Sequence, residues 1–172
     1  MSPFETASIT AAYRSRCEDR VAVLEFGERL ILVVADGAGG TSNGAAAAES
    51  VLREVAAAAS HVRTADEWAQ ALLQIDLRIA DGQSTAVVVD LTPAGLCGAS
   101  VGDSQAWLIA EGQLENLTAR QNRKPLLGTG LAKPVGFAAG SLTGLLLLST
   151  DGFANYVDRA ALLAQLLSLI HI

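Results

Sequence analysis

The chain has 172 residues, a net charge of −6 and an apolar fraction of 51%. This size and apolar content fit one well-packed domain and exclude a disordered chain. The negative charge argues against nucleic acid or an anionic membrane surface as the main partner. Two cysteines, Cys17 and Cys97, are too few for a disulfide framework, and their reduced state is typical of the cytoplasm.

The N-terminus lacks the basic and apolar pattern of a targeting segment, and the longest apolar run, 142–148, is too short to span a bilayer. We therefore expect a cytoplasmic protein with no membrane or nucleic-acid partner, and we expect it to be a monomer.

Apolar runs rich in β-branched residues and bounded by turn residues predict a series of strands. Two of them form a hairpin that turns at Gly27 and Glu28. In chain order, the predicted strands are 6–12, 21–26, 29–35, 84–91, 96–101, 105–110 and 143–149.

Helical signals fall between and after these strands. Asn43 or Ser42 caps an alanine-rich helix over 44–59, and Thr64 caps a second helix. A third helix is predicted over 157–166. The apolar face of the second helix consists of Trp68, Leu72, Ile75 and Ile79. Strands and helices thus come in blocks, which favours antiparallel sheets with segregated helices over a doubly wound parallel sheet.

Three aspartates each follow a strongly apolar run, directly or after a short turn: Asp36, Asp103 and Asp151. A strand interior cannot hold an unpaired carboxylate, because its desolvation costs several kcal/mol. Just beyond the strand ends, such groups lie at the rim of a sheet, where they would repel one another unless a cation held them. Mg²⁺ and Mn²⁺ prefer oxygen ligands of this kind. Each Asp-Gly taken alone is also typical of an ordinary turn.

A fourth acidic element, Glu18-Asp19, precedes the predicted hairpin, and Arg14 lies five residues before Asp19. An Arg with an acidic pair is followed by Asp-Gly-x-Gly-Gly at 36–40, Gly-Asp-Ser at 102–104 and Ser-x-Asp-Gly at 149–152. This ordered set resembles the motifs of the metal-dependent PP2C-type (PPM) protein serine/threonine phosphatases. Four motifs in order are far more specific than one Asp-Gly turn.

The resemblance implies an α+β fold: a four-layer α-β-β-α sandwich of two antiparallel sheets flanked by helices. It also implies two Mn²⁺ or Mg²⁺ ions, with a third, weaker site. The family's pattern makes Asp36 the bridging ligand, Gly37 a carbonyl ligand and Asp151 the second metal-binding aspartate. Asp103 corresponds to the weaker third site.

For the acidic pair, the resemblance favours Asp19 as the ligand, with Glu18 as second choice. Arg14 corresponds to the phosphate-binding arginine, and Arg16 is the alternative; a guanidinium binds phosphate in bidentate fashion. The expected catalytic residues are therefore Asp36, Asp151 and Arg14.

The implied activity is hydrolysis of phosphoserine or phosphothreonine in a protein partner by a metal-activated water. Ala38 stands where some members carry a histidine, which indicates a bacterial-type enzyme. Gln105 replaces a usual arginine, which predicts the loss of a structural ion pair. A second reading is a phosphatase-like regulatory or binding domain without turnover. A hydrolase of unrelated fold is less favoured, because the sequence has no Gly-x₄-Gly-Lys phosphate loop.

The resemblance stops before the end of the chain. The family carries one more metal-binding aspartate, in an Asp-Asn motif, whereas no acidic residue follows Asp158. Residues 167–172 equal one reading frame of a transposon sequencing adaptor. We expect an incomplete phosphatase domain over 1–166, without its last strands, and a non-native tail over 167–172.

Overall fold

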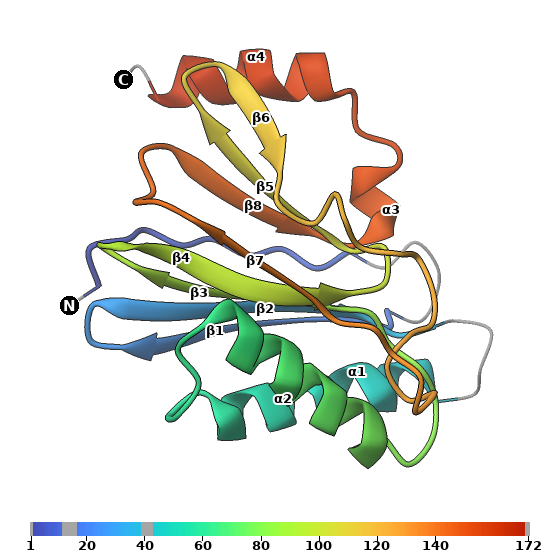
Figure 1. Ribbon diagram of the computed structural model, residues 1–172. Coiled ribbons are helices and arrows are strands. Elements are labelled where there is room, and N and C mark those ends of the chain that lie inside the picture. The colour runs from blue at the N-terminus through green and yellow to red at the C-terminus, as the bar shows by residue number, and fades with distance from the viewer. Residues whose placement is uncertain (1, 12–16, 39–42, 171–172) are drawn as a thin grey trace.

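The computed structural model describes residues 2–11, 17–38 and 43–170 (Figure 1). Its strands are β1 (Asp19–Phe26), β2 (Arg29–Asp36), β3 (Ala86–Thr92), β4 (Gly95–Val101), β5 (Gln105–Ala110), β6 (Gln113–Asn116), β7 (Val135–Ala139) and β8 (Leu145–Ser149). Its helices are α1 (Gly44–Ala58), α2 (Ala65–Arg78), α3 (Asp151–Ala154) and α4 (Arg159–Ile170). In the part of the chain that the structure describes, no helix is both long and apolar enough to cross a membrane.

Two antiparallel sheets form the centre of the molecule. The larger has the order β1-β2-β3-β4-β7 and the smaller the order β6-β5-β8. Helices α1 and α2 cover the outer face of the larger sheet, and α4 lies beyond the smaller sheet (Figure 1). The expected α+β arrangement of two antiparallel sheets flanked by helices is thus confirmed.

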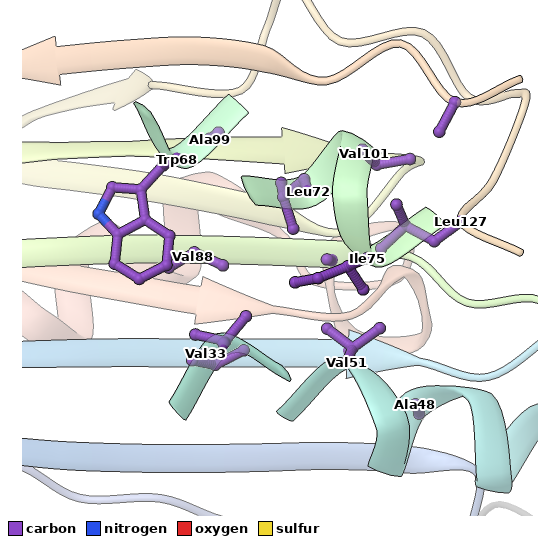
Figure 2. Packing of buried hydrophobic residues seen from close by; sticks show 14 of the residues in the cluster. Val33, Ala48, Val51, Trp68, Leu72, Ile75, Val88, Ala99, Val101 and Leu127 are labelled. Atoms are coloured by element: carbon purple, nitrogen blue, oxygen red, sulfur yellow. The ribbon is translucent and has the colours of Figure 1, made fainter. Parts of the chain in front are cut away.

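The central strands are apolar on both faces, because each face meets a different layer. In β2, Ile31 and Val33 belong to the helix-side core, whereas Leu30 and Val34 belong to the core between the sheets. This alternation follows from the two-residue period of a strand. Figure 2 shows the helix-side core, where Trp68, Leu72 and Ile75 of α2 and Val51 of α1 meet Val33 and Val88 of the larger sheet.

The predicted hairpin and the first two helices are present. Gly27 has a φ of +67° and turns β1 into β2, which pair from Asp19↔Asp36 to Phe26↔Arg29. Thr64 caps α2 through a capping box, in which its hydroxyl accepts from the Glu67 N–H and the Glu67 carboxylate accepts from the Thr64 N–H. Such a cap satisfies N–H groups that the first helical turn leaves free. Asn43 occupies the cap position of α1, but its side chain donates to Asp81 instead.

Some elements differ from the sequence prediction. The predicted strand over 6–12 is wrong, because residues 6–11 are irregular in the structure. Strands β6 and β7 and the short helix α3 were not predicted. β7 contains glycine and alanines with little intrinsic strand preference, and it forms a strand by pairing along β4, where the Phe137 ring lies over Gly98.

A buried ion pair joins the larger sheet to its helices. The Arg29 guanidinium donates to both oxygens of Asp90, at 2.7 and 2.5 Å, and to the carbonyls of Ala59 and Val62, both at 2.6 Å. The indole N–H of Trp68 donates to the same carboxylate at 3.2 Å. Asp90 is 3% exposed, so its charge depends on these partners. The network fixes the end of α1 and the start of α2 against the sheet.

Replacing Asp90 with alanine should therefore lower the free energy of unfolding by about 3–5 kcal/mol, because it leaves a buried guanidinium without its carboxylate. Urea unfolding followed by circular dichroism measures the change. Glu49→Ala is the matched control, since it breaks the exposed Arg20–Glu49 pair and should cost less than about 1 kcal/mol. Equal losses in the two variants would contradict the structural role given to Asp90.

Candidate functional site

Asp36 lies at the end of β2, directly opposite Asp19, the first residue of β1. The antiparallel hairpin brings these two positions together, because the end of one strand neighbours the start of the other. The backbone of Asp36 is held by β3 and the residues before it. Its N–H donates to the Thr85 hydroxyl at 2.9 Å, and its carbonyl accepts from the Thr85 N–H at 2.9 Å and the Ser84 hydroxyl at 3.1 Å.

Asp151 reaches the same place from the smaller sheet. It is the first residue of α3 and follows the end of β8 by one residue. That intervening residue, Thr150, donates its hydroxyl to a carboxylate oxygen of Asp19 at 3.5 Å. The ends of both sheets therefore meet at one edge of the sandwich, and Asp19, Asp36 and Asp151 come together there.

The electrostatics of this edge are unfavourable without a counter-charge. Burial, the largest cause, raises the pKa of Asp36 to about 7 together with the negative charges of Asp19 and Asp151 and side-chain hydrogen bonds to both. Burial is also the main cause of a raised pKa at Asp19, where the hydrogen bond from Asp36 acts in the opposite direction. The hydrogen bond between these two carboxyl groups thus acts to raise the pKa of Asp36 and to lower that of Asp19.

The three carboxylates interact but do not form a ready-made ligand cage. Among residues 2–11, 17–38 and 43–170, no group of three or more His, Cys, Asp or Glu side chains is arranged to hold a metal ion as it stands. Side-chain hydrogen bonds to Asp19 and Asp151 nevertheless contribute to the raised pKa of Asp36. The three carboxylates thus interact, but within the described ranges their oxygens are not arranged around a central cation.

Asp103 is connected to this group by the side chain of Arg123, which contacts both Asp103 and Asp151. The turn that carries Asp103 is tied to Asp36 by Thr85, whose hydroxyl lies 2.6 Å from that of Ser104. Nε of Arg123 donates to Oδ2 of Asp103 at 2.5 Å, and Nη2 of Arg123 lies 3.7 Å from Oδ2 of Asp151. The hydrogen bond and charge of Asp103 raise the pKa of Arg123. None of the sequence motifs includes Arg123.

Gly37 packs where no side chain fits. A Cβ at this position would lie 2.3 Å from the backbone carbonyl group of Gly44 at the start of α1, so only glycine allows this approach. Its N–H donates to the Glu18 carbonyl at 3.3 Å. Of the acidic pair, Asp19 is the residue that lies opposite Asp36 in the strand pairing. Arg14 and its alternative Arg16 lie outside the described residues, so the phosphate-binding assignment stays a prediction.

A buried carboxylate that the sequence did not single out fixes the loop next to the site. Asp76 of α2, 3% exposed, accepts hydrogen bonds from the backbone N–H groups of four residues. These donors are Gly128, Thr129, Gly130 and Ala132, at 2.7–3.0 Å. The same loop joins the site through Leu127, whose backbone pairs with that of Ser84. The one sequence feature that could have indicated its burial is its place on the apolar face of the helix, next to Ile75.

The Gln105 side chain joins two strands of the smaller sheet. Its side-chain oxygen accepts from the Trp107 indole at 2.7 Å and from the Asn116 amide at 3.2 Å, which ties β5 to β6. At this position, where the sequence predicts the loss of an ion pair, the glutamine thus forms two neutral hydrogen bonds.

Comparison with known proteins gave matches among solved structures only. No family model matches the chain, and no curated protein matches it. The serine/threonine phosphatase Stp1 from Staphylococcus aureus matches with a TM-score of 0.77 and 20% identity, over 94% of this chain and 85% of that one. The S. agalactiae serine/threonine phosphatase matches with a TM-score of 0.75 and 17% identity, over 90% and 81%.

The catalytic domain of the serine/threonine protein phosphatase PstP, solved in complex with two manganese ions, matches with a TM-score of 0.73 and 20% identity. The match spans 92% of this chain and 81% of that one. At these identities the similarity establishes the architecture. The chain therefore has the fold of the bacterial PP2C-type serine/threonine phosphatases.

Proposed function

We propose that the protein hydrolyses phosphoserine and phosphothreonine in a protein substrate, with Mn²⁺ or Mg²⁺ as cofactor. The observation that carries this proposal is the convergence of Asp19, Asp36 and Asp151 from the ends of both sheets. The fold similarity supports it, since PstP shares the fold and was solved with two manganese ions. The proposed partner is thus a phosphorylated protein, and neither nucleic acid nor a membrane is involved.

The donor set fits a hard divalent cation. Burial, and then the charges of Asp19 and Asp151, raise the pKa of Asp36 to about 7, and a bound cation would offset both effects. Oxygen ligands of this type select Mg²⁺ or Mn²⁺ over softer metals. Asp19, Asp36 and Asp151 would hold the metal, and Gly37 and Asp103 are the further ligands that the sequence motifs predict. When bound, the metal supplies an activated water and neutralises charge on the phosphoryl oxygens.

The residues of the chain prepare the site for the metal. Asp36 must be ionised before its oxygens can act as ligands, so its raised pKa makes metal binding depend on pH. Ser84 and Thr85, just before β3, hold the N–H and the carbonyl of Asp36, which fixes the backbone that carries this carboxylate. Thr150 orients Asp19 by donating to one of its oxygens. Arg14 is proposed to bind the substrate phosphate.

The alternative is a binding or regulatory domain without turnover. One observation favours it: the carboxylates that the structure describes do not form a complete ligand cage as they stand. Measurements of Mn²⁺ binding and of hydrolysis on the same sample separate the two functions. A protein that binds the metal and a phosphopeptide without hydrolysing the peptide belongs to the second class.

Hydrolysis of a phosphothreonine peptide should require Mn²⁺ and should stop when EDTA removes the metal. Asp36→Asn should lower kcat/KM by orders of magnitude, because it removes a negative charge from the centre of the ligand group. Phosphate release measures this change. Asp66→Asn is the control, since Asp66 is an exposed aspartate in the first turn of α2. Near-normal turnover in Asp36→Asn would overturn the proposal.

The metal-free protein should lose stability as the pH rises from about 4 to about 7. The pKa of Asp36 is raised from 3.8 to about 7 in the folded state. The folded protein therefore binds a proton that the unfolded chain has already lost, and the stability that this proton gives is lost as the pH rises to about 7. Asp36→Asn cannot ionise and should flatten the dependence, gaining on the order of 2 kcal/mol over the wild type above pH 7. Urea unfolding in EDTA at several pH values measures both proteins. Parallel curves would contradict the raised pKa.

A further inference from the structure

Arg123 occupies a position that the proposed function does not explain. Its guanidinium bonds Asp103 through Nε at 2.5 Å and lies 3.7 Å from Asp151 through Nη2. Both contacts are made to Oδ2 oxygens of residues that the proposed function assigns to metal binding. A single cation from the chain itself therefore bridges two of the carboxylates that a divalent ion needs.

The backbone around Arg123 is anchored on both sides, which brings the side chain back to the same place. On one side, the Gln121 side chain accepts from the Ser100 hydroxyl at 3.4 Å and donates to the Lys133 carbonyl at 3.3 Å. On the other, Leu127 pairs with Ser84, and Asp76 holds the loop that follows. The segment is thus fixed to the core through contacts that do not involve the metal-binding carboxylates.

The side chain itself is free to leave. Arg123 is 72% exposed, whereas Asp103 and Asp151 are 25% and 35% exposed. Exposed ion pairs are weak, because water screens both charges and the long arginine side chain loses rotamer freedom when it is held. A divalent cation carries twice the charge and is directly coordinated by oxygen. The contact is therefore strong enough to bias metal binding and weak enough to be displaced.

We propose that Arg123 is a tethered counter-ion that occupies the Asp103–Asp151 pair in the metal-free protein and competes with the divalent cation for it. This inference rests on the proposed function. Cation binding at this pair requires the guanidinium to swing into solvent, so Arg123 sets the metal concentration at which the Asp103 side of the site fills. Asp19 and Asp36, with which Arg123 forms no ion pair in the part of the chain that the structure describes, are affected less.

Calorimetric titration with Mn²⁺ tests the competition without using activity. Arg123→Gln should tighten the weakest Mn²⁺ site about twofold to fivefold, because exposed ion pairs contribute up to about 1 kcal/mol. Arg120→Gln is the matched control. It removes the same charge from the same segment, and Arg120 forms no ion pair with any residue that the structure describes. Equal Mn²⁺ affinities in the two variants would overturn the role of Arg123.

Displacement can also be observed directly. The Nε–H resonance of Arg123, identified by its absence in Arg123→Gln, should move to the position of a solvent-exposed arginine as Mg²⁺ fills the site. A resonance unchanged at saturating Mg²⁺ would overturn the inference while leaving the metal site intact. If the wild type and both variants bind no Mn²⁺, the proposed metal-dependent function fails, and the competition with it.

Discussion

The repulsion among three carboxylates is the constraint on which the functional edge of this protein depends. Asp19, Asp36 and Asp151 come from two sheets and share one half-buried space, where burial and mutual charge raise the pKa of Asp36 to about 7. A protein gains nothing in stability from such an arrangement, because desolvated like charges oppose folding. The divalent cation of the proposed function would supply the positive charge that offsets this repulsion at the ends of β1, β2 and β8. Without it, the rest of the fold must stabilise the edge.

The surrounding structure stabilises the edge through contacts made elsewhere. Strands β1 and β2 contribute apolar side chains to the cores on both of their faces, and β8 contributes Leu146 and Leu148 to the core between the sheets. The Arg29–Asp90 pair, joined by Trp68, fixes the helices against the larger sheet far from the carboxylates. On the other side, the Arg159 guanidinium lies 4.9 Å above the Trp107 ring and joins α4 to the smaller sheet. Hydrophobic burial in two separate layers thus offsets local electrostatic strain at their common edge.

Two charged residues connect the edge to the loop that follows β6. Asp76 is buried, and four backbone N–H groups satisfy its carboxylate, so it fixes the loop permanently. Arg123 is exposed and paired with carboxylates that another cation could use. The difference in burial separates their roles: a desolvated, fully bonded carboxylate is costly to disturb, whereas a solvated guanidinium exchanges partners at little cost. The loop therefore combines a fixed anchor with an exchangeable contact.

The sequence by itself determined the aspartates, the hairpin, the two long helices and the presence of antiparallel sheets. These depend on local signals: turn residues after apolar runs, a capping threonine and helical spacing around Trp68. Only the tertiary structure decided which carboxylates meet, that Asp19 rather than Glu18 faces Asp36, and that Arg123 joins Asp103 to Asp151. Likewise β7 and the bonds to Asp76 could not be predicted. The physical reason is that each joins residues far apart in the chain, and residue preferences within one segment carry no information on its distant partner.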